Sequence, residues 1–292
     1  MEVNGLEDRI RIVARTKDDA FILPLDDGYL ENVDFVMTNP PFYESEADLQ
    51  QSATKKAHPP NSACTGAPVE MVVEGGELAF VGRLLQESLH YRNRVQWYTS
   101  MFGKLSSLQA FIERIKQNGI GNYAVTEFVQ GTKTKRWAIG WSFDAMRPSD
   151  KAARGLKAPA WKSLLPPVTS MQVCSFPFGH GISTVADRIT EVMGSLELNS
   201  WVWEKEKLLG IGRARGNVWS RAWRRRKKQL DHVSHVASTS GSQETEETCK
   251  FAFLVNIHVS KPEATVELRW LEGHDKGLFE SFFGYVKTHM ES

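Results

Sequence analysis

Cysteine is scarce in this sequence, and a long apolar run and a strong net charge are both absent. The cysteines Cys64, Cys174 and Cys249 lie far apart and form no CxxC or Cys/His spacing, which favours a reducing compartment and argues against structural zinc. No stretch approaches the ~18 consecutive apolar residues of a membrane span, and residues 1–10 lack the apolar core of a signal peptide. The net charge of +1 does not by itself indicate a polyanionic partner. We therefore expect neither a metal nor a membrane as partner.

The composition is otherwise that of a chain with sizeable hydrophobic cores. Hydrophobic residues make up 41% of the 292 residues and charged residues 24%, close to the averages of globular proteins. This length suits two ordinary domains. Five of the nine tryptophans lie beyond residue 200, so the two halves of the chain differ in composition.

The first half, residues 1–143, alternates short β-type runs with helical patterns. Residues 9–14 (RIRIVA) alternate with period two, and residues 33–38 (VDFVMT) form a continuous run, as in a parallel strand covered on both faces. The later patterns predict a helix over 77–91, a strand over 95–101, a helix over 107–118 between a Ser106 or Ser107 N-cap and a Gly119 C-cap, and a hairpin of 123–128 with 136–143. This order predicts the back half of an α/β sheet with an antiparallel edge.

The second half has a different pattern. Residues 144–170 are rich in proline and poor in periodic apolar residues, which predicts a linker. Residues 171–292 predict an α+β module with a polar, mobile loop near 232–248. Its expected elements are a strand from 171, a helix from 183, β segments over 200–209 and 217–228, a hairpin of 251–259 with 264–271, and a closing helix with Phe279, Phe282, Phe283 and Val286 on one face.

The run over 33–38 stops on Asn39-Pro40-Pro41-Phe42. Proline cannot donate a backbone hydrogen bond and ends the strand, so these residues lie at the carboxyl end of the strands, where open α/β sheets bind ligands. The Asn39 side-chain oxygen and the Pro40 carbonyl can accept hydrogen bonds from both N–H groups of an aromatic amine, while Phe42 stacks on its ring. A strand-ending turn without a function explains a bare Asn-Pro-Pro equally well.

Other stretches surround this motif with further residues of one known pattern. NPPF resembles the catalytic motif of amino-directed, S-adenosylmethionine-dependent class I (Rossmann-like) methyltransferases. The wider set resembles the methyltransferase-like protein 16 family of U6 small nuclear RNA adenine-N6 methyltransferases, with a bacterial relative acting on large-subunit ribosomal RNA. The matching stretches are TNPPF (38–42), PPNSACTG (59–66), EMVVEGGELAFV (70–81), WYTSMFGKLSSL (97–108) and TEFVQGTKTKRWAIGWSF (126–143).

The resemblance implies a catalytic domain over 1–143, S-adenosylmethionine as methyl donor, and Asn39, Pro40, Pro41 and Phe42 as catalytic residues, with Asn39 also contacting the donor. It further implies RNA contacts near the target adenine from Lys55, Lys56, Asn61, Ser62, Thr65 and Lys104. For any one residue of the loop over 55–66, a place on a solvated surface is an equally good account, and for Lys104 a solvated lysine is the better account.

The second half carries a dense basic cluster. Eight cations fall within 16 residues, interleaved with Trp219 and Trp223: Arg213, Arg215, Arg221, Arg224, Arg225, Arg226, Lys227 and Lys228. Clustered cations bind phosphate, and aromatic rings can stack on unpaired bases. We therefore expect 171–292 to be an RNA-binding domain, although such runs are also found simply solvated or as nuclear-localisation signals.

The sequence departs from the family in the methyl-donor site. A Gly-rich turn and an acidic residue belong before the strand over 9–14, but eight residues precede it and GxGxG occurs nowhere. We expect an N-terminally truncated form that does not bind S-adenosylmethionine properly by itself.

The predicted function is RNA adenine-N6 methylation, with U6 small nuclear RNA as the expected structured partner, in the nucleus and also in the cytoplasm. A catalytically inactive RNA-binding protein is the first alternative. A ribosomal RNA adenine-N6 methyltransferase or a protein glutamine methyltransferase is the second, and the basic cluster argues against the protein substrate.

Overall fold

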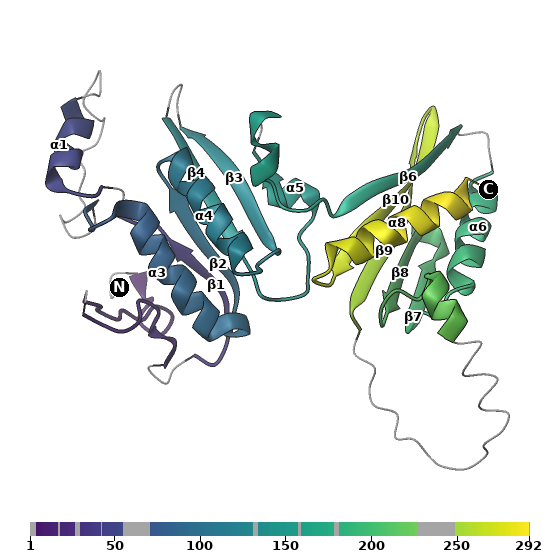
Figure 1. Ribbon diagram of the computed structural model, residues 1–292, viewed down its shortest axis with the longest axis horizontal. Helices are drawn as coiled ribbons and strands as arrows, with labels where there is room; N and C mark the ends of the chain where they lie inside the picture. Colours follow the sequence, from purple (N-terminus) through teal and green to yellow (C-terminus); the bar gives the residue numbers. More distant parts are fainter. Residues whose placement is uncertain are drawn as a thin grey trace, which may run out of the picture. The chain divides into compact units, whose positions relative to one another are not determined.

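The chain forms two compact units in a computed structural model, shown in Figure 1. The structure describes residues 4–16, 18–26, 30–41, 43–54, 71–130, 134–156, 159–177, 181–226 and 249–291. The first unit comprises residues 1–144 and 155–165, and the second comprises 145–154 and 166–292. Each unit contains one five-stranded sheet.

The sheet of the first unit has the strand order β1-β2-β4-β3-β5. Strand β1 (Val33–Thr38) pairs in parallel with β2 (Val95–Phe102), while β4 (Thr134–Trp141) is antiparallel to both β2 and β3 (Tyr123–Gln130). A parallel pair extended by an antiparallel hairpin is the arrangement that the sequence predicted. The α/β class of the first half is therefore confirmed.

Helices α3 (Gly76–Tyr91) and α4 (Leu105–Gln117) pack against each other and lie over the same face of this sheet (Figure 1). Helix α4 buries Leu108, Phe111, Ile112 and Ile115, whose spacing forms one apolar stripe. It begins at Leu105 without a side-chain cap, so the expected serine N-cap was wrong, and Gly119 follows its end at φ 73°, as expected for a terminating glycine.

The opposite face of β1 is exposed, which corrects the prediction of a strand covered on both sides. The side chain of Phe35 is 60% exposed and that of Met37 is 82% exposed, because α3 and α4 cover only the other face. The strand predicted over 9–14 is also wrong. Residues 10–16 have no regular structure, since they pair with no strand among the described residues, and Ile12 is 76% exposed.

The stretch predicted as a linker, 144–170, contains regular structure among its described residues, 144–156 and 159–170. It contains α5 (Asp150–Ala153), β5 (Arg154–Gly155) and the 3-10 helix η4 (Pro159–Leu164), and β5 joins the first sheet beside β3. The side chains of Ala153, Leu156 and Leu164 are buried. The stretch has few apolar residues, but several of them are buried, with Leu156 and Leu164 in the core of the first unit.

The second unit is an antiparallel sheet in the order β6-β10-β9-β8-β7 with helices packed against it. Its elements are β6 (Ser170–Pro177), α6 (Ile182–Gly194), β7 (Ser200–Glu204), η5 (Lys205–Lys207), β8 (Leu209–Ala214), β9 (Phe251–Ser260), β10 (Glu263–Glu272) and α8 (Lys276–Met290). The aromatic rings of Phe251, Phe253, Phe279 and Phe282 form the centre of its core. The predicted α+β class and the β9–β10 hairpin are confirmed.

Residues 217–228 were predicted as a β segment, and this was wrong. Residues 221–226 are helical, because Ser220 starts a helical turn: its hydroxyl accepts a hydrogen bond from the Trp223 amide at 3.1 Å and donates to the Asn217 carbonyl at 2.9 Å. The loop predicted near 232–248 lies outside the described residues.

Candidate functional site

The Asn39-Pro40-Pro41 turn lies directly beyond the carboxyl end of β1, as predicted. The parallel register pairs Thr38 with Ser100, so the turn and the carboxyl end of β2 lie at the same edge of the sheet. Asn39 is exposed, whereas Pro40 and Pro41 are buried. The amide of Asn39 can therefore reach a ligand from a backbone that the two prolines fix. Phe42 lies outside the described residues.

The chain after this turn is held against the segment that precedes α3. The Tyr43 amide donates to the Met71 carbonyl at 3.1 Å, and the Val73 amide donates to the Tyr43 carbonyl at 3.0 Å. Gly76, at φ 63°, faces Glu44 so closely that a Cβ atom there would lie 2.7 Å from the Glu44 Cγ. Residue 76 must therefore be glycine for both the backbone conformation and the contact.

Glu77 connects the start of α3 to the end of β2. Its side chain is 2% exposed, and its carboxylate accepts hydrogen bonds from the Gly103 amide at 2.6 Å and the Lys104 amide at 3.0 Å. A carboxylate that accepts backbone N–H bonds in a buried place is a strong fixed contact. The sequence indicated only a charge suited to the helix dipole at this position. The EGGE motif marked the segment, but not its partner.

Lys104 is the one predicted RNA contact of the first unit that lies among the described residues. Its Nζ is 3.7 Å from the Asp48 Oδ2 of α1 (Glu46–Thr54), and its side chain is 51% exposed. Its charge is thus partly offset, and its role toward RNA stays a prediction. The other predicted contacts lie outside the described residues: Lys55, Lys56, Asn61, Ser62 and Thr65.

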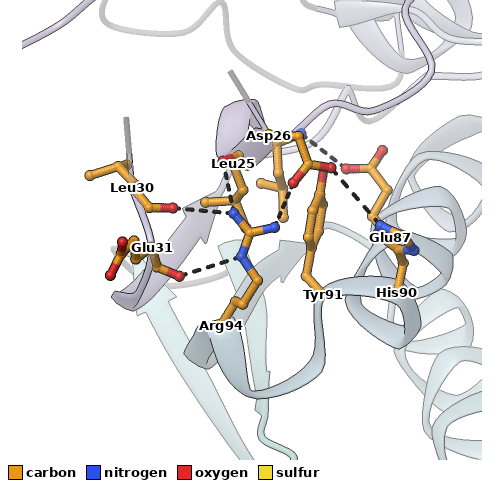
Figure 2. Close-up of polar contacts among 9 residues, drawn as sticks. Leu25, Asp26, Leu30, Glu31, Glu87, His90, Tyr91 and Arg94 are labelled. Carbon is orange, nitrogen blue, oxygen red and sulfur yellow. Dashed lines mark hydrogen bonds and ion pairs between the residues drawn. The ribbon is translucent and has the colours of Figure 1, made fainter. Parts of the chain in front are cut away.

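A separate polar network fixes the amino ends of β1 and β2, opposite the turn (Figure 2). Arg94 donates to the Asp26 carboxylate at 2.5 Å and to the carbonyls of Leu25 and Leu30 at 2.8 and 3.2 Å. The Tyr91 hydroxyl donates to Asp26 at 3.1 Å. The Arg94 guanidinium lowers the pKa of Asp26, and burial together with Asp26 raises the pKa of Tyr91 to about 12.

Glu87 extends this network to the preceding residues. Its buried carboxylate accepts from the amides of Ile22 at 2.7 Å and Leu23 at 3.0 Å. Residues 22–26 and 30–31 are therefore held to α3 and to η3 (Arg92–Arg94) by side-chain hydrogen bonds. The sequence did not indicate any of these contacts, because the partners are more than 60 positions apart.

The basic cluster of the second unit divides into buried, paired and exposed members. Trp219 is 4% exposed and packs on Phe251 and Phe282, with its indole N–H donating to Ser281 at 3.0 Å. Its ring is mostly buried in the aromatic core, and its stacking on RNA bases stays a prediction.

Two of the predicted RNA-binding arginines are engaged within the protein. Arg213 makes a bidentate pair with Glu272, both contacts at 2.8 Å, which raises the pKa of the guanidinium. Arg215 lies 3.4 Å from the Glu197 carboxylate, with its guanidinium over the Trp223 ring. The RNA-binding role of both arginines stays a prediction. The exposed members are Arg221, Arg224, Arg225 and Arg226, while Lys227 and Lys228 lie outside the described residues.

The described residues fit the amine half of a methyl-transfer site but not the methyl-donor half. Among them, no Gly-rich turn leads from a strand on the amino side of β1 into a helix, the usual place for such a cofactor. Gly75 and Gly76 precede α3, but Glu44 packs against Gly76 and the Glu77 carboxylate lies in the first turn. We therefore derive no step through S-adenosylmethionine, and a donor contact from Asn39 stays a prediction.

The described residues include neither a cluster suited to a metal ion nor a helix suited to span a membrane. No group of three or more His, Cys, Asp or Glu side chains is placed to hold a metal ion. None of the described helices combines the length and apolarity that crossing a membrane requires.

Known proteins similar to this chain are RNA methyltransferases. Residues 1–145 match a family model described as RNA methyltransferase. The U6 small nuclear RNA (adenine-(43)-N(6))-methyltransferase of Schizosaccharomyces pombe is 36% identical over 279 residues, which cover 96% of this chain and 65% of that protein. The chain thus spans slightly less than two thirds of the length of this relative.

Solved structures of human relatives match about half of the chain. The hMettl16 catalytic domain in complex with MAT2A 3′UTR hairpin 1 is 37% identical, with 51% of this chain and 52% of that chain covered and a TM-score of 0.43. The N-terminal domain of human METTL16 in complex with SAH is 32% identical, with 49% and 45% covered and a TM-score of 0.35. Residues 1–145 of this chain are thus similar to the RNA methyltransferase family.

Proposed function

We propose that this chain carries the amine-holding half of an RNA adenine-N6 methyltransferase site and an RNA-binding unit that presents the RNA. The observation that carries the proposal is the exposed Asn39, held by a buried Pro40-Pro41 turn at the carboxyl end of β1. The match of residues 1–145 to an RNA methyltransferase family supports the same reading. U6 small nuclear RNA, named for the fission-yeast relative, is the proposed substrate, and the nucleus is the proposed location.

The chain's own residues would act on the acceptor amine. The Asn39 carbonyl oxygen and the Pro40 carbonyl accept the two N–H bonds of the adenine amine, which turns its lone pair out of conjugation with the ring. The target base must first leave its stack, at a cost of a few kcal/mol that is smallest when it is already unpaired. Glu77 acts as a positioning residue, because it fixes the backbone of Gly103 and Lys104 at the same edge of the sheet.

Selective recognition of the amine tests this proposal without depending on the methyl donor. Two RNA hairpins would differ at one unpaired nucleotide, adenosine in one and N6,N6-dimethyladenosine in the other, which has no N–H to donate. Two hydrogen bonds at ~0.5–1.5 kcal/mol each predict about tenfold tighter binding of the adenosine hairpin in a competition titration. Asn39→Ala removes one of the two acceptors and should reduce the preference to about threefold, while Asn118→Ala, at an exposed helix end, should retain it in full. Equal binding of both hairpins by the wild-type chain would reject the proposal.

A second candidate is an RNA-binding protein without catalysis. It is favoured by the lack of a methyl-donor turn among the described residues. Calorimetry with S-adenosylhomocysteine separates the two functions together with the hairpin titration. Micromolar binding of this compound would show that the chain holds the donor as well, and would overturn our expectation from the sequence. RNA binding with neither adenosine preference nor S-adenosylhomocysteine binding would identify the second candidate.

A further inference from the structure

The second unit contains a pocket beside the basic cluster. It has a volume of about 410 Å³ and lies between the end of α6, the turn before residues 221–226 and the last turns of α8. The residues that line it are Ser195, Leu196, Glu197, Val218, Trp219, Trp223, Arg224, Tyr285 and His289. This volume is in the usual range for pockets that bind small organic groups.

Aromatic rings form much of the pocket wall. Trp219 is anchored in the core, whereas Trp223 and Tyr285 are half-buried. The guanidinium of Arg215, which does not line the pocket, lies 4.8 Å from the centre of the Trp223 ring. The rings of Tyr285 and His289 are 4.1 Å apart, centre to centre, with 36° between their planes. Such a wall suits a flat ring, because planar groups stack favourably on aromatic faces.

Polar atoms among these rings are held in place. The Trp223 indole N–H donates to the Glu197 carboxylate at 2.8 Å, and the Ser195 and Tyr285 hydroxyls are 3.2 Å apart. The His289 Nδ1 lies 2.8 Å from the Tyr285 carbonyl. Because a carbonyl only accepts, Nδ1 must carry the proton, and Nε2 of the neutral ring is then an acceptor. The pocket therefore combines stacking surfaces with oriented hydrogen-bonding groups.

The charge around the pocket selects an anionic ligand over a cationic one. Arg224 is part of the wall, and Arg221, Arg225 and Arg226 are exposed on the same helical turn as Trp223. The Glu197 carboxylate is already paired with Arg215 at 3.4 Å, so it does not favour a cationic ligand. A nucleotide in RNA presents a flat base with a phosphate on either side, which matches an aromatic pocket beside a row of arginines.

We propose that this pocket takes up one unpaired nucleobase of the bound RNA, while the exposed arginines of residues 221–226 hold the flanking phosphates. The inference rests on the proposed RNA-binding function of the second unit and adds its recognition element. RNA with a bulged or looped-out nucleotide is then the preferred ligand, and a continuous duplex binds through its phosphates alone.

Two hairpin RNAs test this with the full chain. They have the same stem, and one carries a single bulged uridine, which has no exocyclic amine for the Asn39 site. Stacking of one base predicts about tenfold tighter binding of the bulged hairpin in fluorescence anisotropy titrations. Tyr285→Ala should remove the preference and leave the affinity for the paired hairpin within about twofold, because the arginines remain. Tyr285→Phe, which keeps the ring, should retain the preference.

The outcomes separate this inference from the function on which it rests. If neither hairpin binds, the RNA-binding function of the second unit fails, and the pocket inference fails with it. If the wild-type chain binds both hairpins equally, the pocket inference alone is overturned. Should Tyr285→Ala lose its circular-dichroism signature, His289→Ala replaces it. A preference that survives in a folded variant lacking either ring also overturns the inference.

Discussion

At the scale of single residues, the Glu77 carboxylate holds the backbone at the edge of the candidate site. Its buried carboxylate satisfies two backbone amides at the end of β2. We expect Glu77→Gln to lower the free energy of unfolding by about 2 kcal/mol, because an amide side chain offers one acceptor oxygen and turns a donor toward a second donor. Urea denaturation measures this. Glu113→Gln, at an exposed position on α4, is the matched control and should change stability by less than about 0.5 kcal/mol. A similar loss in both variants would contradict the assignment.

Tyr91 makes the stability of the first unit depend on pH in the alkaline range. Its pKa is raised to about 12, above the ordinary value of about 10 in an unfolded chain. The folded state therefore binds this proton more tightly, so the contribution to stability is full below pH 10 and is lost as the pH rises toward 12. Tyr91→Phe should unfold with a smaller decline of stability over this range. Denaturation at matched pH values measures the difference between the two proteins, in which the titration of other groups cancels. Parallel pH curves would exclude this role.

The tryptophans show how far residue roles can be predicted from sequence. Trp219 and Trp223 are four positions apart within the same basic run, and both were expected to stack on RNA. Both line the same pocket, but Trp219 is almost fully buried in the core and Trp223 is half-buried, because the partners of each ring come from distant strands and helices. The Asn39-Pro40-Pro41 turn was placed correctly, since two successive prolines cannot donate hydrogen bonds to a strand ladder.

At the scale of elements, helices and strands were predicted correctly where the spacing of apolar residues was regular. The prediction failed where a strand depends on pairing with a neighbouring strand. Helices α3 and α4 and the β9–β10 hairpin follow patterns that few other structures satisfy. Residues 10–16 have a strand pattern, but a strand exists only with a hydrogen-bonded neighbour, which none of the described residues provides. Residues 144–170 have little pattern of their own, and the described part of this stretch is ordered by side chains such as Leu156 and Leu164, which are buried in the core of the first unit.

Arg147 tests how this stretch is fastened to the second sheet. The side chain is buried, its guanidinium lies 4.1 Å from the centre of the Trp270 ring, and its Nε donates to the Gly273 carbonyl at 2.8 Å. Burial lowers the pKa of Arg147 to about 10, so its charge carries a desolvation cost. We expect Arg147→Ala to cost about 2–3 kcal/mol through lost packing and an unsatisfied carbonyl.

Arg147→Met separates packing from charge. A methionine retains the apolar contact with Trp270 and removes the desolvation cost, so it should be less destabilising than alanine. Denaturation followed by tryptophan fluorescence measures both variants, and Lys276→Ala, at an exposed ion pair on α8, is the control. Equal effects of the alanine and methionine variants would locate the contribution in the charge rather than in the packing.

At the scale of the whole molecule, the net charge is nearly neutral although positive charge is concentrated locally. The formal charge is +1, yet the helical turn of residues 221–226 exposes four arginines, while Arg213 and Arg215 are engaged by Glu272 and Glu197. Phosphate binding depends on such local clusters, since each neutralised phosphate releases its condensed counterion. The α/β and α+β classes of the two units followed from the sequence, but the division of these cations into paired and exposed did not. Acidic partners far along the chain decide it.

This division predicts how RNA affinity depends on salt. Replacing Arg225 and Arg226 together by alanine should weaken hairpin binding and reduce the slope of log affinity against log salt concentration by about 1.5, at ~0.7–0.9 for each phosphate contact. The loss should be similar for paired and bulged hairpins, because phosphate contacts do not depend on sequence. Titrations between 50 and 200 mM salt give the slope, and a double alanine variant of the exposed Lys205 and Lys207 in η5 is the charge-matched control. An unchanged slope in the arginine variant, or an equal reduction in the lysine control, would mean that RNA meets the second unit through other residues than the exposed arginines.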